Sequence, residues 1–118
     1  MLLRILKSKI HRATVTEANM NYMGSITIDK SLMEASEIYN GEIVNVFNIT
    51  NGNRFETYVI EGKNDDRQII LNGAAARLVQ PSDKIIIIAY GLVEKEKISS
   101  FKPKIIILDD NNQIITQE

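Results

Sequence analysis

Four short runs rich in β-branched and aromatic residues, separated by turn-forming residues, constrain the fold of this chain most. They span residues 42–50, 54–60, 84–93 and 104–108. Because Val, Ile, Thr, Tyr and Phe favour an extended backbone, each run is predicted to be a β-strand. The third run is rich in Ile with little alternation, which suits a strand covered on both faces, as in a closed barrel. A barrel would also leave no exposed sheet edge.

The connection between the first two runs is marked by Asn51-Gly52. Both central positions of a type I′ turn need positive φ, and Asn-Gly is a favoured pair there. The sequence therefore predicts a hairpin over residues 42–60 with this turn at its tip. At the other end of the chain, the polar residues after Ile115 are expected to fray.

Helical signals are few and short. Ser31 and Glu34 have the spacing of a capping box, and Gly41 is placed to end the helix that follows. A second brief helix is predicted at residues 72–78, where Gly73 would let another segment approach its backbone. The fold is thus expected to be mainly β with short helices.

Length and composition limit what else the chain can be. A chain of 118 residues with 44% hydrophobic content forms one domain with a real core. Fourteen basic and fifteen acidic residues give no field that would hold a nucleic acid. There is no cysteine, which removes thiol chemistry, and the single histidine disfavours a metal site. Charges at Arg4, Lys7 and Lys9 interrupt the N-terminal apolar residues, so we expect no signal peptide or membrane span and a cytoplasmic protein.

The pair Gly24-Ser25 by itself is typical of a turn before a strand, here residues 26–29. It also has the residue types that an internal backbone rearrangement needs. Glycine has no Cβ, so a neighbouring hydroxyl can approach its carbonyl, and serine supplies that hydroxyl. The surroundings of the pair decide between the two interpretations.

Three other motifs accompany this pair along the chain. The four motifs are Lys9-x-His11, Tyr22 to Asp29, Arg54-x-x-Thr57-Tyr58 and Asn72 to Ala76. In this order and spacing, the chain resembles the bacterial aspartate 1-decarboxylase family from Met1 to about Ile115. That family makes β-alanine from L-aspartate for pantothenate and coenzyme A biosynthesis.

The resemblance implies a double-psi β-barrel and self-cleavage of the single domain, residues 1–118, into chains 1–24 and 25–118. In the family, the serine oxygen attacks the preceding carbonyl, the resulting ester is eliminated, and the dehydroalanine hydrolyses to a covalent pyruvoyl group with release of ammonia. The pyruvoyl group derived from Ser25 then forms a Schiff base with the substrate amine and accepts the electrons freed when carbon dioxide leaves. The resemblance also implies a homotetramer with active sites between subunits.

Residue roles follow from the same resemblance. Thr57 is expected to stabilise the oxyanion during cleavage and to contact substrate, and Tyr58 to return the proton to the carbanion. Lys9 and Arg54 are the expected partners of the two substrate carboxylates, since guanidinium grips a carboxylate with two hydrogen bonds. The other expected substrate-binding residues are Asn72, Gly73, Ala74 and Ala75, with His11 and Tyr22 as possible pocket residues.

The alternation of side chains along a strand limits which of these residues can share one pocket. With a period of two, Arg54 and Tyr58 point to one face and Thr57 to the other, so Thr57 needs a twist, a bulge or a backbone contact to reach the same pocket. Lys9 and His11 share a face.

Two alternatives remain open at this stage. A non-enzymatic small β-barrel binding module would treat Gly24-Ser25 as a simple turn, because the fold does not fix function. Glutamate differs from aspartate by one methylene, a difference that a pocket discriminates by only about 1–3 kcal/mol. The resemblance alone selects aspartate, and whether cleavage needs an accessory protein is left open.

Overall fold

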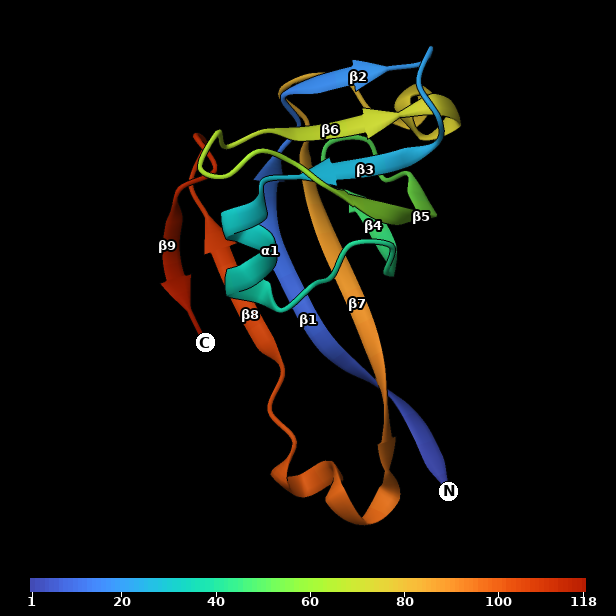
Figure 1. Cartoon of the computed structure of the whole chain (residues 1–118), viewed down its shortest axis with the longest axis vertical. Helices are drawn as coiled ribbons and strands as arrows, with labels where there is room; N and C mark the ends of the chain where they lie inside the picture. The colour runs from blue at the N-terminus through green and yellow to red at the C-terminus, as the bar shows by residue number, and fades with distance from the viewer.

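The computed structural model describes residues 1–118 and is built mainly of β-strands (Figure 1). The nine strands are β1 (Leu2–Thr14), β2 (Glu17–Asn19), β3 (Ser25–Ile28), β4 (Ile43–Asn48), β5 (Arg54–Glu61), β6 (Ile69–Asn72), β7 (Lys84–Glu94), β8 (Lys104–Leu108) and β9 (Ile114–Gln117). One α-helix, α1 (Lys30–Ser36), and two 3₁₀ helices, η1 (Gly73–Leu78) and η2 (Lys95–Ser100), complete the chain. The predicted class, mainly β with short helices, is confirmed.

The strands pair in the order β2-β6-β3-β5-β4-β7-β1-β8-β9. Most neighbours are antiparallel, but β3 runs parallel to β5, β2 to β6 and β1 to β8. No backbone pairing joins β2 to β9, so the sheet is not closed within the chain. The closed barrel predicted from the Ile-rich run is therefore not present as a continuous ladder, and the chain retains two sheet edges.

All four predicted runs form strands, β4, β5, β7 and β8. In β7, Ile85, Ile87 and Ala89 are fully buried, whereas the alternating Ile86 and Ile88 are only partly covered. One face of this strand is therefore packed in the core more completely than the other. The thirteen-residue β1 is not among the predicted runs, because its charged residues interrupt the apolar pattern.

The hairpin predicted over residues 42–60 is confirmed by the antiparallel pairing of β4 with β5. Its turn differs from the type I′ prediction, since Gly52 has φ of +81° but Asn51 does not have positive φ. The connection is longer than two residues. The Asn48 side chain closes it, because its Oδ1 accepts hydrogen bonds from the backbone N–H of Thr50 at 2.9 Å and of Asn51 at 3.3 Å. An asparagine that caps its own turn makes the tight turn unnecessary.

Helix α1 begins two residues earlier than the predicted capping box. Asp29 is its N-cap and accepts a hydrogen bond from the Ser31 N–H at 2.8 Å. The helix ends at Ser36, where Glu37 adopts the left-handed conformation with φ of 57°, rather than at Gly41. Aspartate is as good an N-cap as serine, and here its buried position after β3 decides between them.

The interior consists of one continuous apolar cluster. It joins side chains from β1, β3, α1, β4, β5, β6, β7 and β8; its fully buried members include Ile10, Ile26, Ile28, Leu32, Val44, Val59, Ile69, Leu71, Ile85, Ile87 and Ile106. Because β3 contributes both Ile26 and Ile28, the start of this strand is held firmly in place.

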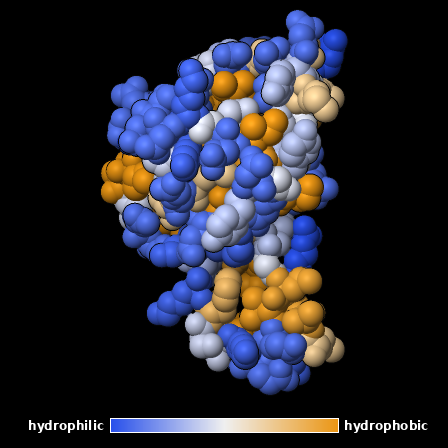
Figure 2. Space-filling view, in the orientation of Figure 1, coloured by the Kyte–Doolittle hydropathy of each residue, from blue (hydrophilic) through white to orange (hydrophobic).

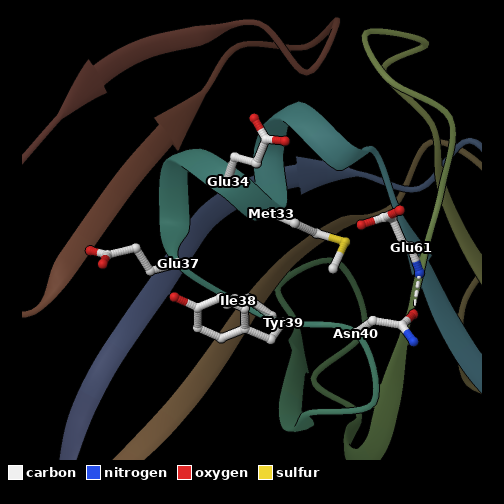
Figure 3. A pocket seen from close by; sticks show the side chains of 7 residues that line it. All are labelled: Met33, Glu34, Glu37, Ile38, Tyr39, Asn40 and Glu61. Carbon is white, nitrogen blue, oxygen red and sulfur yellow. Dashed lines mark hydrogen bonds between the residues drawn. The ribbon is translucent and has the colours of Figure 1, made fainter.

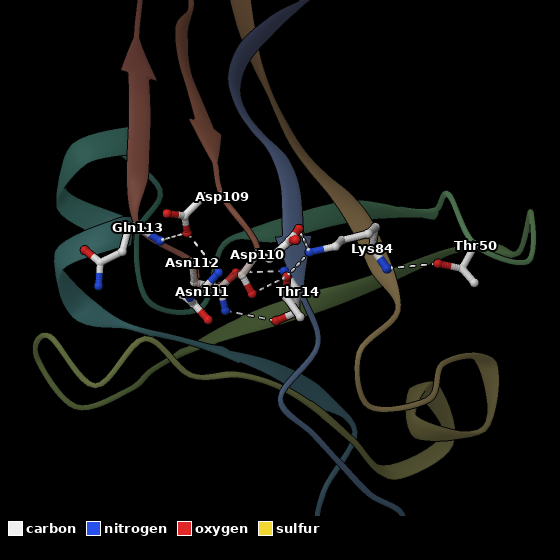
Figure 4. Close-up of polar contacts among 8 residues, drawn as sticks. All are labelled: Thr14, Thr50, Lys84, Asp109, Asp110, Asn111, Asn112 and Gln113. Atoms are coloured by element: carbon white, nitrogen blue, oxygen red, sulfur yellow. Dashed lines mark hydrogen bonds and ion pairs between the residues drawn. The ribbon is translucent and has the colours of Figure 1, made fainter.

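The turn between β8 and β9 is tied to the end of β1 (Figure 4). The buried Asn112 accepts a hydrogen bond from Thr14 N–H at 2.7 Å and donates one to Thr14 O at 3.0 Å. Lys84 forms an ion pair with Asp110 at 2.6 Å. The predicted fraying after Ile115 is wrong, since β9 pairs with β8 and Glu118 exchanges two backbone hydrogen bonds with Ile105.

An arm extends from the body of the molecule. Residues 2–6 of β1 pair with residues 90–94 of β7, and η2 follows at the tip (Figure 1). The arm accounts for the elongated dimensions of 44 × 27 × 25 Å. Figure 2 shows apolar side chains gathered on it, and Leu2 and Leu92 are 53% and 68% exposed.

Candidate active site

The pair Gly24-Ser25 lies where β3 begins, between β6 on one side and β5 on the other. Ser25 is opposite Asn72 in the antiparallel pairing of β3 with β6. Ser25 is completely buried, although serine is usually found at the surface. A buried serine at a strand start, next to a polar partner, is more than the simple turn that the dipeptide alone suggests.

The hydroxyl of Ser25 has two defined partners. It donates a hydrogen bond to the Met23 carbonyl at 3.1 Å and accepts one from Nδ2 of Asn72 at 3.0 Å. Asn72 is buried, so this bond is shielded from water. A donor aimed at the serine oxygen favours the developing negative charge when that oxygen loses its proton.

Gly73 brings its backbone against the segment before Ser25, as the sequence predicts. Its φ is +65°, and a Cβ atom added there would lie 2.6 Å from Gly24 Cα and 2.9 Å from the Tyr22 carbonyl oxygen. Both the left-handed conformation and the contact exclude a side chain. Gly24 itself is exposed, and nothing outside its chain neighbours lies within 4 Å of the position that a Cβ would take.

Thr57 and Tyr58 reach the same place from β5. The parallel pairing of β3 with β5 begins at Ile26 and Val59, and just before it Gly24, Thr57 and Tyr58 line one pocket. Neither the Thr57 hydroxyl nor the Tyr58 hydroxyl has a hydrogen-bond partner within the chain, so both are free for a substrate or an oxyanion. Two residues that are far from Gly24 in sequence are thus adjacent to it in space.

Side chains from both faces of β5 line the same pocket, although the strand contains no bulge. β4 pairs with residues 54–58 along one edge of β5, whereas β3 covers only residues 59–61 along the other edge. Residues 54–58 are therefore unpaired along the edge that faces β3. This edge includes side chains from both faces of β5 and forms one wall of the pocket. Thr57 and Tyr58 point to opposite faces of β5, but both can reach a pocket that runs along the strand edge. Thr57 therefore needs no twist or bulge to line it.

The pocket has a volume of ≈ 470 Å³, within the range of small-molecule sites. Its lining residues come from the strand start, the β5 edge, β4 and η1: Gly24, Ile43, Phe55, Glu56, Thr57, Tyr58, Ala74, Ala75 and Leu78. Five of these nine belong to the predicted site. Ile43, Phe55, Glu56 and Leu78 were not predicted, since an apolar or charged residue on a strand or a helix has no distinguishing signal in a single sequence.

The two expected cations do not reach this pocket within one chain. Lys9 lies in β1, which the pairing order separates from β5 by β4 and β7. Arg54 lies at the start of β5, but its guanidinium stacks on the Phe47 ring at 3.9 Å from the centroid. Neither residue lines the pocket. The single chain therefore does not bring all of the predicted site residues to one pocket, since Lys9 and Arg54 lie elsewhere.

The two possible pocket residues are also placed differently. Tyr22 contributes its backbone to the contact with Gly73, but its side chain is 54% exposed. His11 lies on β1 with Lys9, and its Nδ1 is buried without a hydrogen-bond partner. Burial, together with the positive charges of Lys9 and Arg12, lowers the pKa of His11. Neither side chain lines the pocket at Gly24.

A second hollow lies below α1 (Figure 3). Its lining residues are Met33, Glu34, Glu37, Ile38, Tyr39, Asn40 and Glu61, and Asn40 accepts a hydrogen bond from the Glu61 N–H at 2.8 Å. None of the predicted site residues is among them. Three carboxylates would repel a dianionic substrate, so this hollow is not a candidate for the active site.

The pocket brings the Gly24–Ser25 peptide bond close to several hydroxyl groups. Ser25 supplies a hydroxyl that Asn72 orients, and Thr57 and Tyr58 supply donors on the open side. Donors placed where charge develops are the usual means by which proteins promote such steps. The fold and the site thus define a small, mainly β protein with a buried serine beside a pocket of small-molecule size.

Comparison with known proteins gives the family. A family model described as "Aspartate decarboxylase" matches residues 1–115. Aspartate 1-decarboxylase of Caldicellulosiruptor saccharolyticus is 62% identical over 115 residues, which cover 98% of this chain and 90% of the relative. Those of Acetivibrio thermocellus and Bacillus cereus strain B4264 are 57% and 59% identical, with 98% of this chain and 91% of each relative covered.

The chain belongs to the aspartate decarboxylase family. The resemblance inferred from the four motifs is confirmed, and the alternative of a non-enzymatic binding module is not favoured. None of its helices combines the length and the apolarity that a bilayer crossing requires.

Proposed function

We propose that this protein decarboxylates L-aspartate to β-alanine and carbon dioxide, the step that supplies β-alanine for pantothenate biosynthesis. The observation that carries the proposal is the position of Gly24-Ser25: Ser25 is buried at the start of β3, and Gly24 just before it lines a pocket together with Thr57 and Tyr58. Relatives that share about 60% of their residues with this chain are named for that reaction.

The enzyme first cleaves its own chain. Ser25 Oγ attacks the Gly24 carbonyl carbon, forming an ester as the Gly24–Ser25 peptide bond breaks. Loss of the Ser25 α-hydrogen then breaks the Oγ–Cβ bond, so that the oxygen stays on Gly24 as a carboxylate. Water adds to the resulting dehydroalanine and ammonia leaves. The products are chains 1–24 and 25–118, and the second chain begins with a pyruvoyl group.

Thr57 assists the attack. Its hydroxyl has no partner in the chain and Thr57 lines the same pocket as Gly24, so we infer that it donates a hydrogen bond to the oxyanion that forms on the Gly24 carbonyl. Asn72 complements it by donating to the attacking Ser25 oxygen. Serine is a weak nucleophile at neutral pH, and such paired donors lower the barrier to its attack.

A pyruvoyl group at position 25 would supply a ketone able to condense with the substrate amine and to accept the electrons of the C–C bond that breaks as carbon dioxide leaves. The residues around Gly24 fit it, because the Cβ side of Gly24 is open and Tyr58, whose hydroxyl has no partner in the chain, lines the same pocket. Tyr58 returns a proton to the substrate carbon after carbon dioxide leaves. Asn72 and the backbone of Gly73, Ala74 and Ala75 hold the substrate at the beginning of η1, where N–H groups lack helical partners.

Two cations are required by a dicarboxylate substrate, and we infer that Lys9 and Arg54 reach the pocket from a neighbouring subunit of a homotetramer. In favour of shared sites, neither cation lines the pocket of its own chain. In favour of assembly, the arm exposes Leu2 and Leu92. We further propose that the strands complete a double-psi β-barrel, with His11 and Tyr22 near the shared site.

The reaction is tested by incubating the purified, processed protein with L-aspartate and, separately, with L-glutamate. We expect β-alanine as the dominant product and little γ-aminobutyrate, because the pocket and both cations must match the length of the substrate. Release of γ-aminobutyrate at the higher rate would overturn the choice of substrate. Absence of both products from a cleaved protein would overturn the proposed decarboxylation.

A further inference from the structure

We propose that Thr27 is a positioning residue for self-cleavage, because it fixes the Asn72 side-chain amide so that one of its N–H groups is directed at Ser25 Oγ. This inference rests on the proposed self-cleavage at Gly24-Ser25. It concerns a residue that lines neither the substrate pocket nor the cleaved bond, and it assigns a function to the second hydrogen bond of Asn72.

The contact follows from the pairing of β3 with β6. Ser25 and Thr27 are two residues apart on β3 and share a face, and Asn72 lies directly opposite Ser25. Thr27 is the diagonal neighbour of Asn72, within reach of its side chain. Nδ2 of Asn72 accordingly lies 3.0 Å from Ser25 Oγ and 3.0 Å from Thr27 Oγ1. One amide nitrogen therefore bridges two hydroxyls on the same strand.

The hydrogens of this bridge can be assigned from the partners. The Ser25 hydroxyl hydrogen is directed at the Met23 carbonyl, so Ser25 Oγ is an acceptor toward Asn72. An amide nitrogen has two hydrogens, and the second is accepted by Thr27 Oγ1. If the Asn72 amide were turned over, its oxygen would face Ser25 Oγ, whose hydrogen is already engaged. The engaged Ser25 hydroxyl thus selects this orientation, and Thr27 stabilises it by accepting the second N–H, so that the amide need not turn toward another partner.

Thr27 itself is held by the segment that follows β5. A Cβ atom added to Gly62 would lie 3.1 Å from Thr27 Cγ2 and 2.9 Å from the Ile28 carbonyl oxygen, so the Gly62 backbone is packed closely against this residue. A β-branched side chain has few χ1 choices, and this contact restricts its methyl group. The hydroxyl of Thr27 is then left on the side of Asn72.

The chemical consequence concerns the serine oxygen. A hydrogen bond from the Asn72 amide favours the ionised form that develops on Ser25 as it attacks Gly24. Without an acceptor at position 27, the second N–H of a buried amide is unsatisfied, and the side chain can rotate to find another partner. Since a net hydrogen bond of this kind corresponds to roughly a fivefold to tenfold change in rate, its loss should slow cleavage by about that factor.

The test compares Thr27→Val with Thr27→Ser. Uncleaved precursors of both variants and of the wild type are purified, incubated at one temperature, and followed by denaturing electrophoresis and mass spectrometry. Valine keeps the shape but removes the acceptor, so Thr27→Val should cleave about fivefold to tenfold more slowly. Serine keeps the acceptor, so Thr27→Ser should restore a rate close to that of the wild type. Equal rates for Thr27→Val and the wild type, or equally slow cleavage of both variants, would overturn the inference.

A matched control is offered by Thr16, whose hydroxyl also hydrogen-bonds to β6, at Ile69, but away from Asn72. Thr16→Val should cleave at the wild-type rate even if its melting temperature falls, and slow cleavage there would assign the Thr27 effect to general destabilisation.

A double-mutant cycle with Asn72→Ala gives a second measurement. Adding Thr27→Val should slow the Asn72→Ala protein no further, because Thr27 acts through Asn72. A full additional tenfold loss would contradict this route. A wild-type precursor that never cleaves would instead overturn the proposed function, whereas a cleaving wild type with an unaffected Thr27→Val protein would overturn the inference alone.

Discussion

Ser25 has three neighbours that act at different stages of its chemistry. The Met23 carbonyl accepts the hydrogen of its hydroxyl, the Asn72 amide donates to its oxygen, and Thr57 lines the same pocket as Gly24. The first two contacts exist before any cleavage, so the serine is already oriented in the intact chain. Preorganised donors of this kind need no rearrangement at the moment of reaction.

Replacing Ser25 by alanine should abolish both cleavage and decarboxylation, since the nucleophile and the source of the ketone are the same side chain. The variant should still fold, because the change is small and the hydrogen bonds it removes are worth about 1 kcal/mol each. Denaturing electrophoresis, a β-alanine assay and circular dichroism check the three statements. Cleavage at the usual bond in this variant would show that another group attacks Gly24.

Tyr58→Phe separates the two stages. The phenol hydroxyl has no partner within the chain, so its removal should cost little stability. Cleavage should proceed, because the proton from Tyr58 is required only after carbon dioxide leaves. Turnover of L-aspartate should fall by about 100-fold or more, the usual contribution of a positioned proton donor. Loss of cleavage in this variant would instead assign Tyr58 to processing.

At this scale, the sequence predicted most of the residues at the pocket but not their contacts. Gly73 was predictable because only glycine allows the close approach that the structure contains. Thr27 was not, because a threonine in a strand is a common strand former and its bond to Asn72 depends on the β3–β6 register. The placement of Lys9 and Arg54 was also beyond the sequence, since it depends on the order of the strands in the sheet.

Among the elements, α1 and the segment after β5 are joined by one carboxylate. Asp29 is buried and accepts hydrogen bonds from the N–H groups of Ser31, Asp65 and Arg67 and from the Ser31 hydroxyl. Burial opposes its ionisation, but the hydrogen bonds, that from Arg67 first among them, together hold the pKa of Asp29 below its usual value. The residue therefore links the end of β3, the start of α1 and the loop before β6.

Asp29→Asn should destabilise the protein by about 2–3 kcal/mol at pH 7, because hydrogen bonds to a charged acceptor become weaker neutral ones and one oxygen is lost. A carboxyl group whose pKa is lower in the folded state stabilises the fold above its unfolded pKa of about 3.9. That stabilisation is lost as the pH falls through the folded pKa. In urea unfolding, the difference in free energy of unfolding between the two proteins should shrink at acid pH. A difference that stays constant with pH would exclude the charge of Asp29 as its cause.

The elements show why strand prediction succeeded in some places only. β4, β5, β7 and β8 carry dense β-branched residues, whereas β1 mixes them with four charged residues and β9 is fully exposed. β2 and β6 have three and four residues, too short for a periodic signal. β9 pairs because the buried Asn112 anchors its turn, a tertiary contact that the polar tail does not reveal.

For the whole molecule, the central question is how a single chain completes its site. The body brings Gly24, Thr57, Tyr58 and Asn72 together, while the arm of β1 and β7 projects apolar side chains away from it (Figures 1 and 2). A domain of this size rarely leaves an apolar arm uncovered unless a partner packs on it. A second copy of the chain would cover the arm and bring the missing cations, as the proposed homotetramer requires.

Leu92→Asp should therefore weaken assembly. The side chain is 68% exposed on the arm, so a carboxylate there costs the single chain little but would be costly in an apolar interface. Sedimentation velocity should show a shift from tetramer to smaller species. Ile115→Asp is a matched control, since Ile115 is 64% exposed on β9, away from the arm. An unchanged tetramer in Leu92→Asp, or an equal shift in both variants, would exclude the arm as the interface.

The most direct measurement is the intact mass of the purified wild-type protein under denaturing conditions after warming. We predict two chains, residues 1–24 ending in a free carboxylate and residues 25–118 beginning with a pyruvoyl group. Their masses should sum to that of the intact chain plus one water and minus one ammonia. A single intact chain, or two chains whose masses sum to the intact chain plus one water alone, would contradict the formation of the pyruvoyl group at Ser25.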